Sequence, residues 1–330
     1  MSEADVSTPR VSVVIAAYNV ESYIGRAIAS VRAQSMASHE ILVADDGSSD
    51  GTCRMVEELA LRDASVRLLR TSANAGAGAA RNRAIAAARG EWVAVLDADD
   101  TWKPWRLERL LSAATARNCV IAADNYVQVD DATGREVGVA FHDSRPESAI
   151  TALRFIQSER PLGRVRFGLL KPVVRRDFLE KHGIRYPVGI YAEDFHFFMQ
   201  VLLAGGQGVL LSEPGYLYTL PESPANGARS LGTRTNARLS DRIWIADDLM
   251  EKFGACMSPQ DRQAILQYRR WMQDIADGSQ ARELWRRGDH LRAIGAALAS
   301  SRGAFSYAVT SPTVKRWRAR LSPRAVRPPL

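Results

Sequence analysis

The 330-residue sequence predicts an α/β fold, in which a mostly parallel sheet is flanked by helices and followed by a helical C-terminal extension. Two observations carry this prediction. Short apolar runs alternate with helical patterns through the first hundred residues, which is typical of a parallel sheet with helices on both faces. From residue 239 onward the pattern is helical, and the last 20 residues are basic and interrupted by prolines.

The elements of the first hundred residues follow in a regular order. A β-branched apolar run at 11–17 predicts a buried strand. The segment 21–34 places apolar residues at helical spacing, which predicts an amphipathic helix. The same alternation then predicts a strand at 40–44, a helix at 52–62, a strand at 66–70, a helix at 78–88 and a strand at 91–96.

The next residues predict a less regular part of the same domain. Its expected elements are a helix from Pro104 to about 115, a strand at 120–123, a hairpin at 125–140, a helix at 150–157, a strand at 169–175, helices at 176–182 and 192–204, and strands at 208–211 and 216–220. The stretch 221–235 is rich in Pro, Gly, Ser and Asn, which predicts a loop. We therefore expect one α/β domain at 1–236, with halves at 9–103 and 104–236, and a helical extension with a basic tail at 237–330.

Composition excludes several classes of protein. No apolar run approaches the roughly 18 residues that cross a bilayer, and the first residues lack a signal-peptide pattern. The three cysteines are scattered, so we expect neither a disulfide framework nor a zinc site, and a reducing, cytoplasmic compartment is favoured.

The net charge of +7 is unevenly distributed along the chain. Residues 261–330 hold 14 basic and 5 acidic side chains, so the basicity belongs to the C-terminal part. This part has no helix-turn-helix pattern and no aromatic platform for stacking on bases. We therefore expect no nucleic-acid partner, although the sequence pI near 9.5 raises a nucleic-acid-binding protein as an alternative.

Acidic side chains follow the apolar strand at 91–96. Asp97 and Asp99 are one residue apart, and Asp100 comes next. Two carboxylates at a strand end can hold Mg²⁺ or Mn²⁺, which completes its coordination with water and phosphate oxygens. The alternative is a solvated acidic turn, but like charges at such spacing repel one another unless a cation binds there.

Two further clusters point to nucleotide binding. Asp45 and Asp46 end the second predicted strand, where carboxylates can accept hydrogen bonds from a base or a ribose. The glycine-containing segment 74–82 leads into a helix that presents Arg81. Because this segment follows the third strand and has Arg81 where the last glycine of GxGxxG would stand, we reject a dinucleotide fold. Arg81 could instead meet phosphate or base, with ordinary surface charge as the alternative.

A last acidic pair, Glu193 and Asp194, opens a predicted helix that is rich in aromatic residues. A carboxylate there could act as a general base. The alternative is that both acids only stabilise the N-terminus of the helix through its dipole.

Taken together, the segments 11–19, 45–52, 74–82, 97–100 and 193–194 occur in an order and spacing that resemble family 2 glycosyltransferases. The resemblance covers roughly residues 9–218. It implies the GT-A fold, inverting chemistry and a relationship to bacterial exopolysaccharide or O-antigen glycosyltransferases such as the succinoglycan glucosyltransferases. The QxxRW signature of processive synthases is absent, which favours transfer of a single sugar.

The resemblance also implies roles for individual residues. The nucleoside pocket would be lined by Ala17, Tyr18, Asp45, Asp46 and Arg81. Asp97 would contact ribose or metal, and Asp99 would bind the metal. Asp194 would be the general base, supported by Glu193.

The two halves of the domain, 9–103 and 104–236, would bind the nucleotide sugar and the acceptor respectively. The donor would be a UDP-sugar, with glucose preferred. The acceptor would be a saccharide, and the resemblance favours a lipid-linked one.

An alternative activity and the role of the C-terminal tail stay open at this point. A sugar-phosphate nucleotidyltransferase also binds a nucleotide beside a metal, but its glycine-rich loop with Arg and Lys is missing from residues 16–19. The basic tail at 302–327 could contact the inner face of the cell membrane as a peripheral helix. It could equally pack on the domain or end as a solvated segment.

Overall fold

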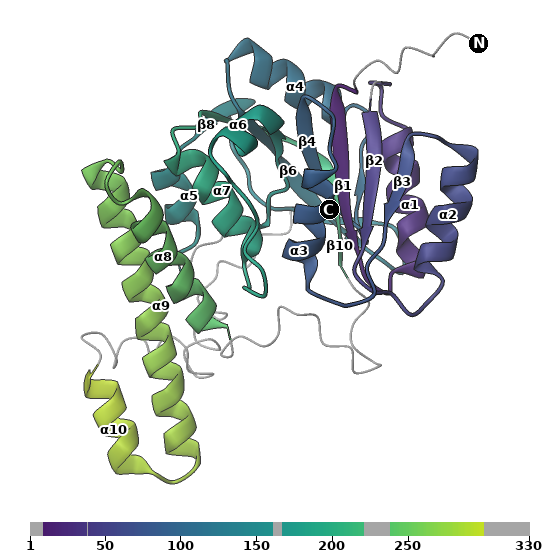
Figure 1. The fold of residues 1–330 in the computed structure, drawn as a ribbon. Helices are drawn as coiled ribbons and strands as arrows, with labels where there is room; N and C mark the ends of the chain where they lie inside the picture. Colours follow the sequence, from purple (N-terminus) through teal and green to yellow (C-terminus); the bar gives the residue numbers. More distant parts are fainter. Residues whose placement is uncertain (1–8, 38, 161–166, 221–237, 300–330) are drawn as a thin grey trace, which may run out of the picture.

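The computed structural model describes residues 9–37, 39–160, 167–220 and 238–299 (Figure 1). Its sheet has ten strands, eight of them in the order β3-β2-β1-β4-β9-β6-β10-β5, while β7 pairs with β6 and β8 with β10. The strands are β1 (Val11–Ala17), β2 (His39–Asp45), β3 (Val66–Leu69), β4 (Trp92–Asp97), β5 (Thr101–Trp102), β6 (Ile121–Asp130), β7 (Glu136–Val139), β8 (Glu147–Ile150), β9 (Val173–Arg175) and β10 (Gly208–Leu220).

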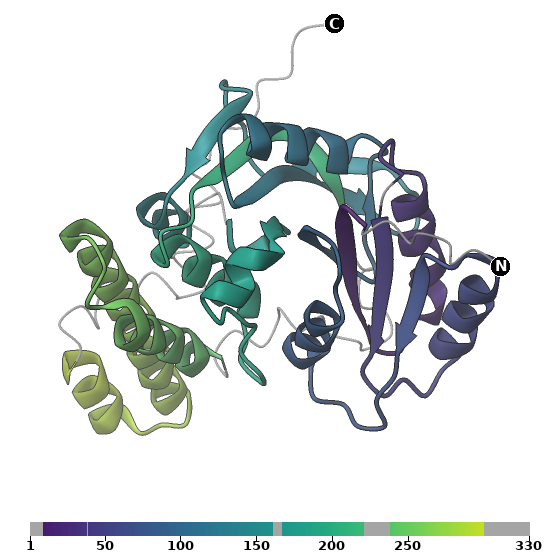
Figure 2. The same ribbon diagram turned by 45° about the horizontal axis from the view of Figure 1, so that its top comes forward.

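Helices cover this sheet and continue into the C-terminal extension. They are α1 (Glu21–Arg32), α2 (Thr52–Arg62), α3 (Ala77–Ala86), α4 (Arg106–Ala116), α5 (Ala152–Ser158), the short 3₁₀ helix η1 (Phe167–Leu169), α6 (Arg176–Lys181), α7 (Glu193–Leu203), α8 (Leu239–Phe253), α9 (Pro259–Arg286) and α10 (His290–Ala299). Figure 2 shows α1 and α2 on one side of the β1–β3 part of the sheet and α3 on the other. The predicted α/β class and helical extension are therefore confirmed.

The core lies along the parallel strands. The three longest pairings, β1 with β2, β1 with β4 and β6 with β10, are all parallel. In β1, β2 and β4 the apolar side chains other than Ala16 are at most 2% exposed, because helices cover both faces. This covering explains why the three strands appear in the sequence as continuous apolar runs rather than as alternating patterns.

The second half of the sheet departs from the prediction. The strand expected at 169–175 is reduced to β9, because Pro172 has no N–H for a ladder hydrogen bond. β9 then lies antiparallel between β4 and β6. The two strands expected around 208–220 form one strand, β10, whose register shifts at Pro214. The helix expected to begin at Ile150 begins at Ala152, because Thr151 caps it by accepting a hydrogen bond from the N–H of Arg154.

The extension packs against the α/β domain through α8 and α9, and α9 reaches past the domain with α10 beside its far end (Figure 1). The predicted boundary at 236/237, the predicted loop at 221–235 and the basic tail lie outside the described residues. No described helix combines the length and apolarity that crossing a membrane requires.

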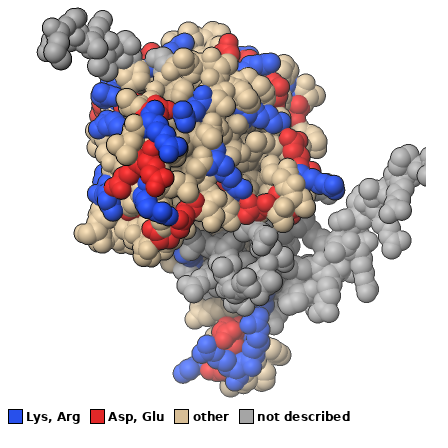
Figure 3. Space-filling view, turned by 90° about the vertical axis from the view of Figure 1, so that its right-hand side faces the viewer, with Lys and Arg blue, Asp and Glu red and all other residues tan. Residues whose placement is uncertain are grey.

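The edge of the sheet at β3 carries acidic and basic side chains interspersed with one another (Figure 3). Several of them form exposed ion pairs, for example Arg54 with Glu21 and Arg70 with Glu57. Such pairs contribute roughly 0–1 kcal/mol each, so this face is a solvated surface and not a stabilising network.

Candidate active site

A cavity of about 710 Å³ lies at the carboxyl end of β1. Its walls come from five parts of the chain: the end of β1, the turn after β2, the start of α3, the segment before α7, and the first turn of α8. The lining residues include Ala16, Ala17, Tyr18, Asp46, Asn74, Gly76, Gly78, Pro187, Tyr191, Glu193, Arg238 and Asp241. Ligands bind at this edge of open α/β sheets.

Asp46 is the buried acidic group of the cavity wall, at 2% exposure. Its Oδ2 accepts hydrogen bonds from the N–H groups of Ala75 (3.0 Å) and Gly76 (2.7 Å). Gly76 has φ +90° and ψ 163°, a conformation open essentially to glycine alone, and this turn presents both N–H groups to Asp46. The other oxygen, Oδ1, is buried, has no hydrogen-bond partner among the described residues and lies 3.7 Å from the Arg83 guanidinium.

Asp45 occupies a different position from the one predicted. It is 1% exposed and is not part of the cavity lining. Its Oδ2 accepts hydrogen bonds from the N–H groups of Gly47 and Ser48, each at 3.1 Å. Asp45 thereby shapes the turn that precedes α2, whereas Ala17 and the half-exposed ring of Tyr18 line the cavity.

Next to the cavity lies a cluster of five charged side chains: Arg81, Lys171, Asp97, Glu193 and Asp194. The Arg81 guanidinium lies 2.7 Å from Asp97, 3.0 Å from Glu193 and 3.5 Å from Asp194. The Lys171 ammonium lies 2.8 Å from Asp97 and 2.5 Å from Asp194. Both cations are about 95% buried. The structure thus brings together four residues that the sequence predicted, and it adds Lys171.

The two cations control the charge on Asp97. Burial opposes its ionisation, but Lys171 and Arg81 outweigh burial and hold the pKa of Asp97 well below its usual range. Burial likewise disfavours the charged form of Lys171, and the attraction of Asp194 and Asp97 raises the pKa of Lys171 above its usual value. Asp97, Lys171 and Arg81 are therefore held in their charged forms.

Asp99 and Asp100 follow Asp97 and have different surroundings. Asp100 is buried, and it accepts hydrogen bonds from the Tyr216 hydroxyl and the Thr219 N–H, both at 2.7 Å. Asp99 is exposed, and its carboxylate forms no hydrogen bond or ion pair with the described residues. Desolvation by the surrounding protein and repulsion from Asp97 raise the pKa of Asp99, and the same two causes raise the pKa of Asp100.

These acids fit a divalent cation. One carboxylate oxygen from each of Asp97, Asp99 and Asp100 can be chosen so that all three lie within 4.8 Å of one another. Both oxygens of Asp97 are engaged by Arg81 and Lys171, and those of Asp100 by Tyr216 and Thr219. Asp99 is therefore the carboxylate with free ligand capacity, and a bound cation would relieve the mutual repulsion of the group.

Helix α7 presents Glu193 and Asp194 to the cluster. The aromatic residues that follow are buried: Phe195 and Phe198 stack on Phe155, and Phe197 stacks on Tyr186. The residue before the helix, Ala192, has φ 65° and ψ 35°, a left-handed conformation that costs a non-glycine residue about 1–2 kcal/mol. The acids of this first turn thus do more than stabilise a helix end, because they bind Arg81 and Lys171.

Both ring nitrogens of His196, on the same helix, have protein partners. Its ring is buried, its Nε2 lies 2.7 Å from Asp248 of α8, and its Nδ1 lies 3.1 Å from the Gln200 amide.

The sequence reasoning missed Lys171 and the two tyrosines that frame the cluster. The ring of Tyr186 lies 5.1 Å from the Arg81 guanidinium, and the Tyr216 hydroxyl bonds Asp100. One signal for Lys171 was present, since a single lysine interrupts an apolar run immediately before Pro172. Lysine is almost never fully buried without a partner, so a lysine within a predicted buried strand indicates carboxylates nearby.

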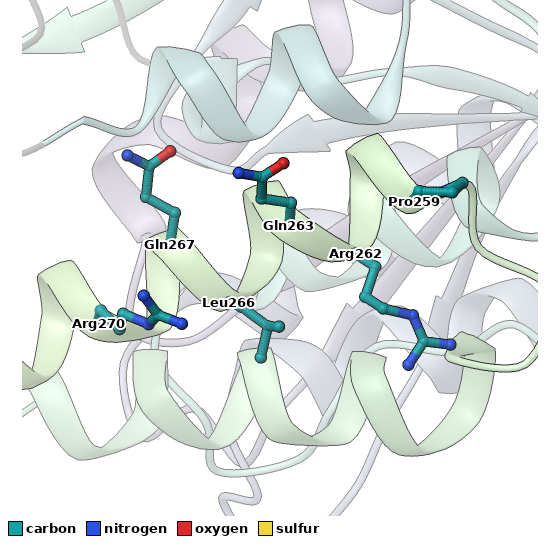
Figure 4. Close-up of a pocket in the computed structure, with 6 residues that line it drawn as sticks. All are labelled: Pro259, Arg262, Gln263, Leu266, Gln267 and Arg270. Atoms are coloured by element: carbon teal, nitrogen blue, oxygen red, sulfur yellow. The ribbon is translucent and has the colours of Figure 1, made fainter.

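A second cavity, of about 440 Å³, lies along α9 and is lined by Pro259, Arg262, Gln263, Leu266, Gln267 and Arg270 (Figure 4). None of the predicted site residues lines it, and its described lining contains no carboxylate. The cavity beside the charged cluster is therefore the candidate active site.

Comparison with known proteins agrees with this geometry. Residues 12–175, about half of the chain, match the model of Glycosyl transferase family 2. The succinoglycan biosynthesis protein ExoO of Rhizobium meliloti is 38% identical over 218 residues, which cover 65% of this chain and 62% of ExoO. ExoU of the same organism is 29% identical over 293 residues, which cover 87% of this chain and 82% of ExoU. The aligned part of the chain thus spans less than two thirds of ExoO.

Among solved structures, residues 1–349 of S. aureus TarS in complex with UDP-GlcNAc superpose with a TM-score of 0.63 at 22% identity, covering 79% of this chain and 72% of TarS. This likeness confirms the GT-A type fold. The segment matched by the family model contains Tyr18, Asp46, Arg81, Asp97 and Lys171, and it ends before Glu193 and Asp194. The chain belongs to glycosyltransferase family 2.

Proposed function

We propose that the protein is an inverting glycosyltransferase that moves one sugar from a UDP-sugar, with glucose preferred, to a hydroxyl of a saccharide acceptor. We further propose that it acts in bacterial exopolysaccharide or surface polysaccharide assembly, on a lipid-linked acceptor. One observation carries the proposal: Glu193 lines the nucleotide-sized cavity and also binds Arg81 of the charged cluster, so donor cavity and acidic pair form one continuous site.

On the donor side, Tyr18 offers a half-exposed ring for stacking, and the Asp46 carboxylate in the cavity wall would accept a hydrogen bond from the nucleoside. On the acceptor side, Asp194 is the base. Its Oδ2 is held by Lys171, whereas Oδ1 has no hydrogen-bond partner among the described residues and lies 3.5 Å from Arg81. We therefore assign the proton of the acceptor hydroxyl to Oδ1, which is buried in this structure and has no other hydrogen-bond partner among the described residues.

The reaction is a direct displacement. As the acceptor oxygen loses its proton to Asp194, it forms a bond to the anomeric carbon on the face opposite the diphosphate. The bond between that carbon and the diphosphate oxygen breaks, and its electron pair leaves with UDP. One carboxylate suffices, and the configuration at the anomeric carbon inverts.

Asp99, with Asp97 beside it, would hold Mg²⁺ or Mn²⁺. When bound, the cation offsets negative charge on the leaving diphosphate. Three named relatives support the wider assignment. ExoO and ExoU are named for succinoglycan biosynthesis, and TarS is described in complex with UDP-GlcNAc.

The basic tail is proposed to hold the protein at the inner face of the cell membrane, close to a lipid-linked acceptor. From Arg302 to Arg327 the sequence has seven basic and no acidic residues, and each Lys or Arg near an anionic surface contributes about 1 kcal/mol. The test compares sedimentation of the full chain with anionic vesicles before and after replacing Lys315, Arg316, Arg318 and Arg320 with serine. Equal sedimentation of both proteins would show that the tail does not bind membrane.

The central experiment is a panel of nucleotide sugars with and without Mn²⁺, measured first by thermal shift and then by product analysis with saccharide acceptors. A donor at 100 times its dissociation constant stabilises the fold by about 2.7 kcal/mol. A glycosyltransferase consumes UDP-sugar and releases UDP, whereas a nucleotidyltransferase consumes UTP and releases pyrophosphate. The proposal would be refuted if no nucleotide sugar raised the melting temperature, or if a parallel reaction of UTP with a sugar 1-phosphate released pyrophosphate.

A further inference from the structure

The C-terminal extension reaches the active site through the first turn of α8. Arg238 and Asp241 line the same cavity as Tyr18, Asp46 and Glu193. Asp241 Oδ2 accepts a hydrogen bond of 3.0 Å from the N–H of Tyr191, two residues before α7 begins. The extension therefore contacts the segment that presents the acidic pair, although it lies outside the part of the chain that matches the family model.

The start of α7 depends on such an external contact. Its N-cap residue, Ala192, makes no side-chain hydrogen bond to the helix and holds a left-handed conformation that non-glycine residues seldom adopt. A backbone in that conformation persists only where the surrounding structure fixes it. The bond from Tyr191 to Asp241 supplies a fixed point directly beside Ala192, and the guanidinium of Arg238 lies 4.8 Å from the centre of the Tyr191 ring.

A second contact holds α8 against α7 on the other side of the acidic pair. Asp248 binds the buried ring of His196 at 2.7 Å. Asp241 and Asp248 are seven residues apart and therefore lie on one face of α8. The two contacts bracket Glu193 and Asp194, so that face of α8 sets where the first turn of α7 lies.

We propose that Asp241 is a positioning residue, which fixes the backbone at Tyr191 and Ala192 and thereby places Asp194 against the acceptor hydroxyl. The expected effect of Asp241 on turnover rests on the proposed function, whereas its effect on the backbone does not. Asp241 itself touches no reacting atom in this arrangement. A displacement of the base by about 1 Å can cost roughly a hundredfold in rate, so a single backbone anchor can matter for turnover.

The test compares three full-length variants. Asp241→Ala removes the acceptor oxygen, whereas Asp241→Asn keeps an oxygen that can accept from the Tyr191 N–H. Asp247→Ala is the matched control, because Asp247 is a half-exposed acid of the same helix whose ion pair goes to Arg269 of α9 and not to α7. We expect Asp241→Ala to lose about 10- to 100-fold in kcat while its calorimetric affinity for UDP changes little. Asp241→Asn and Asp247→Ala should stay within about threefold of wild type.

A second measurement does not depend on activity. Amide hydrogen exchange of a peptide covering residues 188–198 should be faster in Asp241→Ala than in wild type or in Asp247→Ala, because the start of α7 loses its anchor. If Asp241→Ala does not fold, Asp241→Ser takes its place, since the serine hydroxyl is one bond too short to replace the carboxylate.

The outcomes separate the two proposals. A wild-type protein without transfer activity would refute the proposed function, while faster exchange confined to 188–198 would still support the anchor. Wild-type turnover and wild-type exchange in Asp241→Ala would overturn the inference alone. The inference would also be overturned if Asp241→Ala and Asp247→Ala lost kcat equally. The same holds if Asp241→Asn did not restore kcat.

Discussion

The ammonium nitrogen of Lys171 lies 2.5 Å from a carboxylate oxygen of Asp194. The same nitrogen lies 2.8 Å from Asp97, so one buried lysine joins the end of β4 to the start of α7. Two cations, Lys171 and Arg81, therefore lie beside the acids of α7, and they hold Asp97 in its charged form.

We expect Lys171→Met to destabilise the protein by about 2–3 kcal/mol. Breaking a buried pair costs about 3–5 kcal/mol, and the partial exposure of Asp97 and Asp194 reduces that cost. The control is Lys103→Met, which removes an exposed pair with Glu136 and should cost less than about 1 kcal/mol. Urea unfolding at neutral pH measures both, and similar values for the two variants would contradict the expectation.

The effect of Lys171 on stability should depend on pH. The pKa of Asp97 is lower in the folded protein than in the unfolded chain, so its ion pairs stabilise the fold above the ordinary carboxyl pKa, near 4. This contribution is lost as the pH falls toward the folded-state pKa. The difference in stability between wild type and Lys171→Met should therefore shrink below about pH 4.

Asp194→Asn should keep UDP affinity and lose about 10²- to 10⁴-fold in kcat, the usual contribution of a general base. Glu193→Gln should lose less, because Glu193 binds Arg81 and has no contact with Lys171 among the described residues. Steady-state kinetics with a fixed acceptor measures both variants. A larger loss in Glu193→Gln would mean that the two roles are reversed.

Asp99→Ala should abolish Mn²⁺-dependent UDP binding and leave the fold intact, because Asp99 is exposed and carries the free ligand oxygens of the acidic group. Titration of UDP with and without Mn²⁺ measures this. Glu91→Ala, an exposed acid beside the opposite end of β4, is the control and should bind as wild type. If the affinity of Asp99→Ala for UDP still depended on Mn²⁺, Asp99 would be ruled out as the metal ligand.

Arg106→Met should destabilise the protein by about 3–5 kcal/mol. Arg106 is fully buried, bonds Asp124 at 2.8 Å and donates to the backbone oxygen of Lys171 at 2.6 Å, so its loss leaves a buried carboxylate without its cation. Arg109→Met, three residues further along α4, removes an exposed pair with Glu213 and should cost less than about 1 kcal/mol. Equal losses of unfolding free energy in the two variants would contradict the expectation that the buried ion pair stabilises the fold more than the exposed pair.

Lowering the pH should destabilise the wild-type protein more than it destabilises the His196→Gln variant. Burial, opposed in part by Asp248, lowers the pKa of His196 in the folded state below its ordinary value of about 6.5. A group with a lowered folded pKa stabilises the fold above its unfolded pKa, and this contribution is lost as the pH falls below about 6.5. Melting temperatures at pH 7.5 and pH 5 measure the difference, and parallel decreases in both proteins would refute it.

The sequence by itself determined the alternation of strands and helices and the strand-end positions of Asp46 and Asp97. It also indicated Arg81, Glu193 and Asp194 as members of a site. These are local signals, because apolar periodicity reflects which face of an element is buried and polar clusters at strand ends meet at one edge of the sheet.

Only the tertiary structure decided how these residues are paired. The segment that leads into the antiparallel strand β9 places Lys171 against Asp194, 23 residues away in the chain. Helix α8 returns to place Asp241 against Tyr191, 50 residues away. It also assigned Asp45 to the turn and not to the cavity. Such contacts depend on the path of the chain between the elements, and neither periodicity nor local propensity encodes that path.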